Sequence, residues 1–281
     1  MSRANNFSII IPAYNEESLI ATRLTQLADA LPKNCTEIII ICNGCIDQTY
    51  TVAKNTIDTI NNTVYHCNFM LVEISKGCKI NALNEGVKQS NNNTIILLDA
   101  DIDISSSNCA DLVAILASKS LMAVSPKAIF DFKKSSWLIK KFYSVVSKST
   151  YNQQHRIANV IALAPEAVKK LFPLPIIIAD DAYIQRSITE KDYLVVNNLT
   201  YRFACPLTIL STIKVQSRII RGNLQLKKTH PNLKGPKSTL PKLTFIDYGI
   251  FIFIKLIALT VAHIELKLNI QKWHQDESSR K

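Results

Sequence analysis

The sequence is poor in glycine and lacks a glycine-rich loop where many nucleotide-binding proteins carry one. Only six glycines occur in 281 residues, and the first apolar segment is followed by Pro-Ala-Tyr-Asn-Glu. That absence excludes a nicotinamide dehydrogenase, which needs a GxGxxG loop at this place. It also counts against a sugar-phosphate nucleotidyltransferase, which would carry a glycine-rich loop with a basic residue there.

The seven cysteines form neither a disulfide framework nor a complete zinc site. Their number is odd, and Cys42 and Cys45 make one CxxC without a second such pair or a nearby pair of histidines. A structural zinc ion needs four ligands, so we expect free, reduced thiols, as is usual in the cytosol. The apolar run at residues 7–12 is too short for a signal-peptide core, so we expect the bulk of the chain to stay in the cytosol.

Acidic residues are scarce relative to basic ones. The chain has 22 acidic and 33 basic residues, for a formal net charge of +11, which indicates an anionic partner. The lysines gather just before the last apolar segment, and no basic–aromatic interleaving typical of nucleic-acid binding appears. We therefore expect an anionic membrane surface and no nucleic acid. A basic, membrane-associated, non-enzymatic binding protein stays open as an alternative.

Short apolar segments alternate with helical patterns through the first hundred residues. We expect strands at residues 7–11, 37–41, 64–74 and 94–98, with the first stopped by Pro12, and helices at residues 16–31, 47–60 and 80–87. This alternation predicts an α/β fold with a mostly parallel central sheet flanked by helices. The second half predicts helices at residues 135–150 and 211–228, and strands at residues 157–163, 193–196 and 201–206.

Polar residues follow three of these strands at the point where each ends. Ligands of parallel sheets bind beyond the carboxyl ends of the strands, so the three clusters are expected at one edge. After the fourth strand, Asp99 and Asp101 are two residues apart and can share a divalent cation, Mg²⁺ or Mn²⁺, that also holds a diphosphate. An isolated DxD is more often a polar turn. Asp103 is either a further metal ligand or a solvated turn residue.

Four segments in succession resemble the motifs of a family-2 glycosyltransferase. They read FSIIIPAYNEESLI, CNGCIDQT, KGCKINALNEGV and ILLDADIDIS, and the resemblance continues through IADDAYIQ and RIIRGNLQL, over about residues 7–228. The closest likeness is to bacterial members that build surface polysaccharides or glycolipids. The resemblance implies the GT-A fold, with one nucleotide-binding α/β domain over residues 1–230 and a basic, Pro-containing linker at residues 231–242.

The resemblance also implies a nucleotide-diphosphate sugar donor and a role for each matching residue. Asp101 is expected to bind the metal directly, with Asp99 and Asp103 as further ligands. The residues expected to contact the nucleotide sugar are Pro12, Ala13, Tyr14, Glu16, Asn43, Lys79, Asp99, Ala100, Arg218 and Arg221. Cys42 departs from the family, which frequently has an aspartate at this position.

Asp180 and Asp181 match the family's acidic pair, whose second member is the general base of inverting enzymes. Such a base takes the proton of the acceptor hydroxyl; the alternative for this pair is a helix N-cap. Arg218 and Arg221, three residues apart, share a helix face and suit diphosphate oxygens. The processive synthases carry QxxRW in this region, and this chain has no such Gln or Trp. We therefore expect transfer of one sugar to a hydroxyl acceptor, a lipid-linked or surface-glycan precursor.

The chain ends in an apolar helical segment and a polar tail, residues 243–281. The apolar part is long enough to span a bilayer, but Asp247, Lys255 and Glu265 fall on one narrow side of it. Such a stripe favours a helix lying in the membrane interface, although a spanning helix and a helix packed on protein stay open. We expect an enzyme at the cytoplasmic face of the inner or plasma membrane, peripheral or C-terminally anchored. A chain ending near Pro241 should then be soluble.

Overall fold

The computed structural model describes residues 6–31, 36–62, 68–104 and 106–268. The chain divides into two compact units. Unit 1 comprises residues 1–127, 157–176 and 187–201, and unit 2 comprises residues 128–156, 177–186 and 202–281. The C-terminal helix groups with unit 2, so it does not form a separate body in the structure.

The strands form one mixed sheet in the order β3-β2-β1-β4-β7-β6-β8-β5. Strands β3, β2, β1 and β4 are parallel neighbours, whereas β7 is antiparallel to both β4 and β6. The predicted parallel sheet is therefore correct for the first four strands only. The strand bounds are β1 Phe7–Ala13, β2 Thr36–Asn43, β3 Asn68–Ile74, β4 Ile95–Leu98, β5 Asp103–Ile104, β6 Ala123–Asp131, β7 Val160–Leu163 and β8 Tyr193–Ala204.

Helices flank the sheet in unit 1 and form a layer of their own in unit 2. Unit 1 holds α1 Ile20–Ala30, α2 Thr49–Asn61, α3 Lys79–Gln89, α4 Ser106–Ser118, α6 Pro165–Leu171 and the short turn Glu190–Asp192. Unit 2 holds α5 Trp137–Ser147, the turn Tyr151–His155, α7 Asp180–Ser187, α8 Ile209–Thr229 and α9 Phe245–Lys267. Residues 231–242 contain neither helix nor strand.

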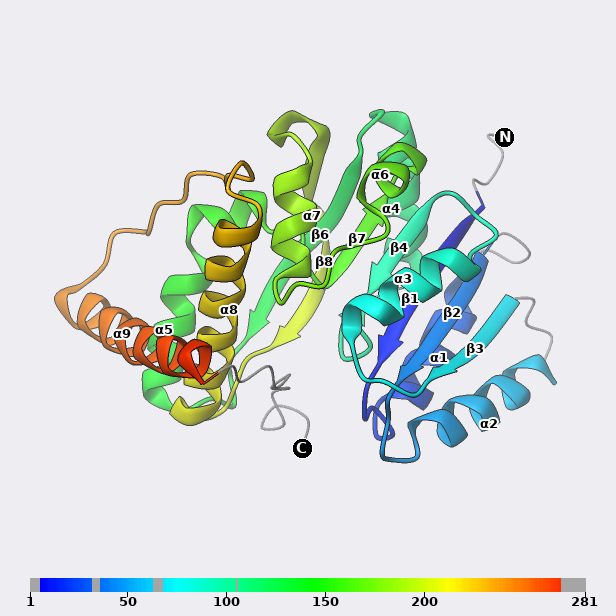
Figure 1. The fold of residues 1–281 in the computed structure, drawn as a ribbon, viewed down its shortest axis with the longest axis horizontal. Coiled ribbons are helices and arrows are strands. Elements are labelled where there is room, and N and C mark those ends of the chain that lie inside the picture. The colour runs from blue at the N-terminus through cyan, green and yellow to red at the C-terminus, as the bar shows by residue number, and fades with distance from the viewer. Residues whose placement is uncertain (1–5, 32–35, 63–67, 105, 269–281) are drawn as a thin grey trace. The chain divides into compact units, whose positions relative to one another are not determined.

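The core of unit 1 is built from isoleucines of adjacent parallel strands. Residues 9–11 of β1 and 38–41 of β2 are isoleucines with no exposed surface, because a parallel sheet is covered on both faces. Helix α3 packs closely on β1, since a Cβ on Gly86 would lie 2.4 Å from Cγ2 of Ile10. Figure 1 shows α3 in front of these strands. This packing fixes the start of α3, Lys79, at the carboxyl edge of the sheet.

Two local predictions in unit 1 were wrong. Strand β1 continues through Pro12, which pairs with Ile41 of β2; on the other side, β4 pairs only with residues 8–10, so the missing N–H interrupts no ladder. Helix α1 begins at Ile20, four residues later than expected. The preceding segment is a loop that starts at Tyr14 and includes Asn15, whose φ is +52°.

The core of unit 2 is aromatic and joins α5 to α9. It contains the buried residues Ile139, Phe142, Tyr143, Cys205 and Ile254, with Phe130, Phe203 and Phe251 packed against it. The rings of Phe142 and Phe251 stack with centroids 5.6 Å apart. Helices α5, α8 and α9 lie side by side in Figure 1. The last helix is therefore part of a folded core.

The polar stripe of α9 faces α5 and α8. Asp247 forms an ion pair with Lys141 of α5 at 3.2 Å, Lys255 Nζ donates to Gln216 of α8 at 2.7 Å, and Glu265 forms an ion pair with Arg221 of α8 at 3.0 Å. Of the three placements considered for this helix, the structure therefore has it packed on protein. The polar stripe faces unit 2 because its charged side chains bind partners on α5 and α8. Residues 269–281, including the expected tail, lie outside the described residues.

Candidate active site

The loops that follow β1, β2 and β3 meet at the carboxyl edge of the sheet in unit 1. Gly44 has a φ of +65°, and a Cβ there would lie 2.5 Å from the backbone nitrogen of Gly77. A Cβ on Gly77 would in turn meet the ring of Tyr14 at 3.7 Å. Only glycine at position 44 allows this approach, because any side chain would strike the neighbouring backbone. These contacts join the loops after β1 and β2, two of the three for which convergence was predicted, and add the loop after β3.

The loop after β1 is held by hydrogen bonds to the segment that opens α2. The Glu16 backbone nitrogen donates to Thr49 Oγ1 at 2.7 Å, and the Ile46 nitrogen donates to Asn15 Oδ1 at 3.0 Å. Asp47 Oδ1 accepts from the Thr49 nitrogen at 3.0 Å, although the N-cap residue of α2 is Gln48. The loop residues Tyr14 and Glu16, which follow Pro12 and Ala13 at the end of β1, are therefore tied to the segment that opens α2.

Asp99 is the centre of a polar network at the end of β4. Its Oδ1 lies 2.8 Å from Lys79 Nζ, and its Oδ2 accepts from Asn159 Nδ2 at 2.9 Å. The hydroxyl of Tyr201 donates to Asn159 Oδ1 at 3.1 Å. Asn159 has a φ of +63°, a conformation that asparagine adopts more readily than most residues. Lys79 and Asp99, both predicted, are thus brought together, whereas Asn159 and Tyr201 were missed.

Asp101 and Asp103 have different surroundings. Asp101 is exposed and follows the buried Ala100. The Asp103 side chain is 60% exposed and lies 3.6 Å from the guanidinium of Arg23. Across the described part of the chain, no three His, Cys, Asp or Glu side chains form a ready metal cluster. Asp99, Asp101 and Asp103 therefore do not form a three-carboxylate cage by themselves.

The end of β2 carries an amide and two thiols. Asn43 is buried, and its Oδ1 accepts from the Cys78 backbone nitrogen at 2.7 Å, which ties the end of β2 to the start of α3. A hydrogen bond from Cys42 lowers the pKa of the Cys45 thiol to about 6. The same contact, together with burial, raises the pKa of Cys42. Cys45 is thus the thiol of this pair suited to be a thiolate at neutral pH.

Asp180 and Asp181 open α7 in unit 2. Asp180 is buried and Asp181 is half-buried, with its Oδ1 accepting from the Ala182 nitrogen at 2.8 Å. The residue before them, Ala179, lies against Gly222 of α8, where a Cβ would come within 2.8 Å of the Ala179 Cβ. The start of α7 is therefore fixed by direct packing on α8.

Arg218 and Arg221 both lie on α8, but only Arg218 has appreciable exposed surface. Arg221 is 2% exposed, and its Nε lies 3.0 Å from Glu265 of α9. Ser217 donates to the same carboxylate. Sequence reasoning assigned both arginines to the donor diphosphate. In this structure the guanidinium of Arg221 joins α8 to α9.

Comparisons with known proteins identify the family of this chain. The family model of Glycosyl transferase family 2 matches residues 8–163, more than half of the sequence. The chain belongs to this family. It is a glycosyltransferase, and both the family resemblance and the GT-A type of α/β fold expected from the motifs are confirmed. Membership decides against the nucleotidyltransferase and against the non-enzymatic binding protein. No curated protein sequence matches the chain.

Solved structures similar to this chain share its fold at low sequence identity. The mannosyltransferase PcManGT from Pyrobaculum calidifontis, in complex with GDP-Man and Mn²⁺, is 17% identical with a TM-score of 0.62; the match covers 96% of this chain and 76% of that one. S. aureus TarS 1–349 in complex with UDP is 14% identical with a TM-score of 0.55, covering 95% and 75%. Glucosyl-3-phosphoglycerate synthase from Mycobacterium tuberculosis, with Mn²⁺ and UDP-glucose, is 16% identical with a TM-score of 0.54, covering 79% and 78%.

Proposed function

We propose that this glycosyltransferase is a metal-dependent, inverting enzyme that moves one sugar from a nucleotide-diphosphate donor to an acceptor hydroxyl. The observation that carries the proposal is the pairing at the end of β4. Asp99 is fixed by Lys79 and Asn159, while Asp101, two residues later, stays exposed at the edge where the loops converge. A fixed carboxylate beside an exposed one suits a site that receives a charged donor.

Asp101 is the residue that would hold Mg²⁺ or Mn²⁺. The absence of a three-ligand cluster in the described chain fits such an ion, because Mg²⁺ is usually held by one or two carboxylates together with substrate phosphates. Bound there, the ion would neutralise charge on the leaving diphosphate. The complexes of PcManGT and of glucosyl-3-phosphoglycerate synthase contain Mn²⁺ with a donor, which supports the assignment. Asp99 would contribute through the ribose or the outer shell of the ion.

Lys79 and Arg218 are proposed as the cations closest to the donor phosphates, and Tyr14, Glu16 and Asn43 as the residues around the base. Lys79 is already held at the site by Asp99, and its side chain is 18% exposed. We assign Arg221 to helix packing, because its partner Glu265 already neutralises its charge.

Asp181 is proposed as the general base. As the acceptor oxygen attacks the anomeric carbon, the carboxylate of Asp181 takes the hydroxyl proton. The bond between that carbon and the diphosphate oxygen breaks, and its electrons leave with the nucleotide. Attack opposite the leaving group inverts the anomeric centre. Asp180 is buried, so its proposed role is to orient its neighbour.

The acceptor is proposed to be a lipid-linked or surface-glycan precursor at the cytoplasmic face of a membrane. The support is the 23-residue helix α9, which is long and apolar enough to cross a membrane by length and composition, with only 17% of its most apolar window buried. The missing QxxRW supports transfer of one sugar in place of polymerisation.

The test compares Asp181→Asn with Asp180→Asn. The amide keeps the shape of the side chain but cannot take a proton, so Asp181→Asn should lower transfer by at least about 10²-fold while donor affinity stays near normal. A larger loss in Asp180→Asn would reverse the two roles. NMR of the product gives an independent check: a retained α-linkage from an α-linked donor would contradict inversion.

A further inference from the structure

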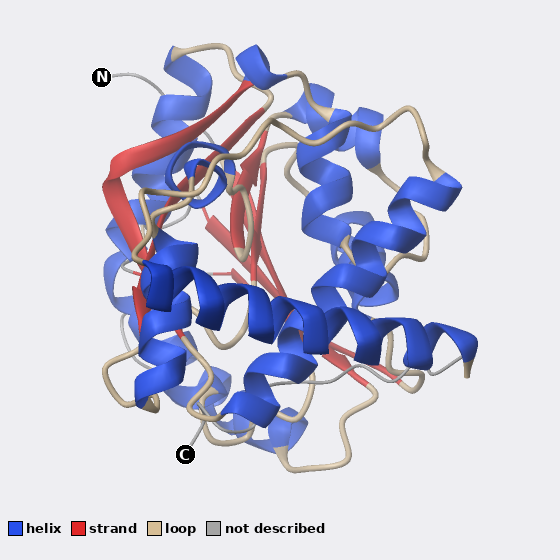
Figure 2. Ribbon diagram, turned by 90° about the vertical axis from the view of Figure 1, so that its left-hand side faces the viewer, coloured by secondary structure: helices blue, strands red, loops and turns tan. Residues whose placement is uncertain are grey.

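Helix α9 carries an apolar face that the described part of unit 2 leaves uncovered. Sixteen large hydrophobic side chains are exposed in the described chain, and nine of them belong to residues 245–268. A Cβ on Gly249 would meet nothing within 4 Å. Figure 2 shows α9 as the long helix that crosses in front of its neighbours in unit 2. The outer face of α9 consists of Phe245, Ile246, Tyr248, Phe253, Leu256, Leu259, Ile264 and Leu266.

The charge left around this outer face is positive. The two carboxylates of α9, Asp247 and Glu265, are paired with Lys141 and Arg221 inside unit 2. The exposed Lys267 lies at the end of the helix. The exposed Lys242, three residues before Phe245, lies just ahead of the other end, and residues 231–242 contain no acidic residue. Both carboxylates of the helix are therefore neutralised by ion pairs with α5 and α8.

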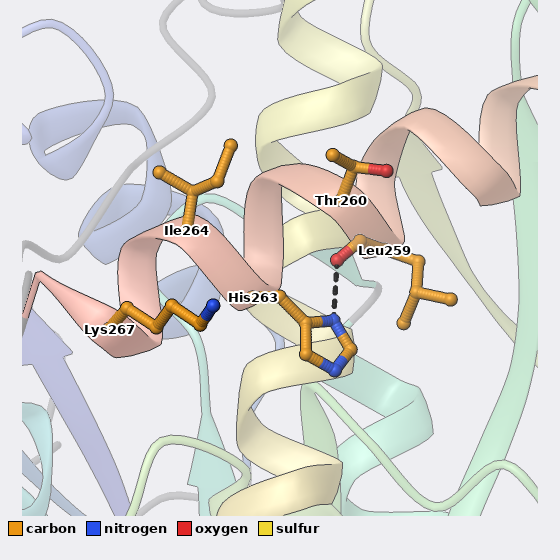
Figure 3. A pocket seen from close by; sticks show the side chains of 5 residues that line it. All are labelled: Leu259, Thr260, His263, Ile264 and Lys267. Carbon is orange, nitrogen blue, oxygen red and sulfur yellow. Dashed lines mark hydrogen bonds between the residues drawn. The ribbon is translucent and has the colours of Figure 1, made fainter.

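A shallow pocket of about 380 Å³ lies on the same side of α9. It is lined by Leu259, Thr260, His263, Ile264 and Lys267, whose side chains Figure 3 shows. His263 Nδ1 donates to the Leu259 carbonyl at 2.9 Å, which holds the imidazole beside the pocket. Two apolar side chains next to a lysine fit the junction between an acyl chain and a phosphate group.

We propose that the outer face of α9 docks on an anionic phospholipid bilayer while the helix stays folded against unit 2. Apolar side chains enter the headgroup boundary, and the lysines beside them meet lipid phosphates, which is how amphipathic helices bind in plane. This inference rests on one part of the proposed function, namely that the acceptor lies at a membrane.

Two other arrangements of α9 fit the contacts less well. A spanning helix would have to break the contacts of Asp247, Lys255 and Glu265 and would leave Arg221, which is 2% exposed, without its carboxylate. A second copy of the chain on the outer face would bring together two surfaces of the same sign, each with lysines at its ends. An anionic bilayer satisfies both the apolar face and these lysines.

The test is flotation of the full chain with vesicles of phosphatidylcholine alone and of an equal mixture with phosphatidylglycerol. The wild-type chain should float with both, more completely with the anionic mixture, and salt should reduce the difference. The double variant Phe253→Ser with Leu256→Ser should stay at the bottom of the gradient. The matched control, Ile129→Ser with Leu210→Ser, also removes two exposed apolar side chains of unit 2 and should float like the wild type. His263→Ala with Lys267→Ala should still float but show a weaker preference for phosphatidylglycerol than the wild type.

Equal flotation of the Phe253/Leu256 variant and the wild type would overturn the proposal. So would a lipid-free dimer that this variant dissociates, because the partner would then be a second copy. Resistance of the bound wild-type chain to alkaline carbonate extraction would indicate a spanning helix. Donor hydrolysis in lipid-free solution reports on the proposed function separately: the outer-face variant should keep it. A chain that floats but hydrolyses no donor would contradict the enzyme mechanism alone.

Discussion

At the scale of single residues, two aspartates in one short motif have different surroundings. Asp99 is engaged by Lys79 and Asn159, and Asp101 is exposed. Asp101→Asn should therefore abolish the increase in nucleoside diphosphate affinity that Mn²⁺ gives, because the amide removes the charge that attracts the ion. Calorimetry with and without Mn²⁺ measures it. Asp103→Asn is the matched control, and a metal effect that survives in Asp101→Asn would refute the assignment.

The thiol of Cys45 offers a pH-dependent signal from the same loop cluster. Its pKa is lowered to about 6 by the hydrogen bond from Cys42, so the reactive thiolate forms below the usual pH range. Between about pH 5 and about pH 7 its alkylation rate should rise about tenfold and then level off. The alkylation rate of an ordinary thiol should keep rising above neutral pH. Labelling followed by peptide mass spectrometry measures each site. The plateau should vanish in Cys45→Ser. A Cys45 rate that keeps rising above neutral pH would show that its pKa is not lowered.

At the scale of elements, the contact between α7 and α8 fixes the proposed base. A Cβ at position 222 would come within 2.8 Å of the Ala179 Cβ and 3.1 Å of its nitrogen. The backbone there has little freedom, because the neighbouring Ile178 nitrogen donates to Gln225 Oε1 at 2.8 Å. Gly222→Ala should cost about 1–3 kcal/mol of unfolding free energy, as overpacking does, and lower kcat by displacing Asp181.

Urea unfolding and steady-state kinetics on Gly222→Ala measure the two effects. Gly249→Ala is the matched control, since a Cβ there meets nothing and alanine is the better helix former. That variant should be as stable as the wild type or more so. If the urea midpoint of Gly222→Ala equals that of the wild type, the close packing of α7 on α8 is not what fixes Asp180 and Asp181.

The elements that sequence predicted well are those fixed by local pattern. The isoleucine runs of β1 and β2 and the polar loops behind them predicted strands and a binding edge, because burial on both faces leaves a continuous apolar run. Strand β6 was missed, since Pro126 and Lys127 interrupt its pattern and pairing with β7 and β8, both distant in sequence, makes it a strand. The interaction of Asn159 with Asp99 spans 60 residues, so no local signal could reveal it.

At the scale of the whole molecule, the apolar tail is part of a folded unit. The sequence separated α9 from the catalytic domain, because its composition resembles a membrane segment. The structure gives it a buried seam of Ile254, Ala258 and Ala262. Which side of an amphipathic helix packs on protein depends on partners far away in sequence, here Arg221 and Lys141. A hydropathy pattern contains no information on those partners.

This packing reverses the expectation for a chain that ends after Pro241. Such a truncation removes Phe251 and Ile254 from the aromatic core of unit 2 and takes Glu265 away from Arg221. Burial of one large apolar side chain contributes about 1.5–3 kcal/mol, so losing Phe251 and Ile254 removes a large part of the stability of a typical domain. The truncated chain should therefore unfold at a much lower temperature, or fail to accumulate in soluble form, even without lipid. Thermal unfolding compares it with the full-length Phe253→Ser, Leu256→Ser variant, which keeps the seam and should melt near the wild type. If the truncated chain has the same unfolding temperature as the wild type, α9 does not contribute to the stability of unit 2.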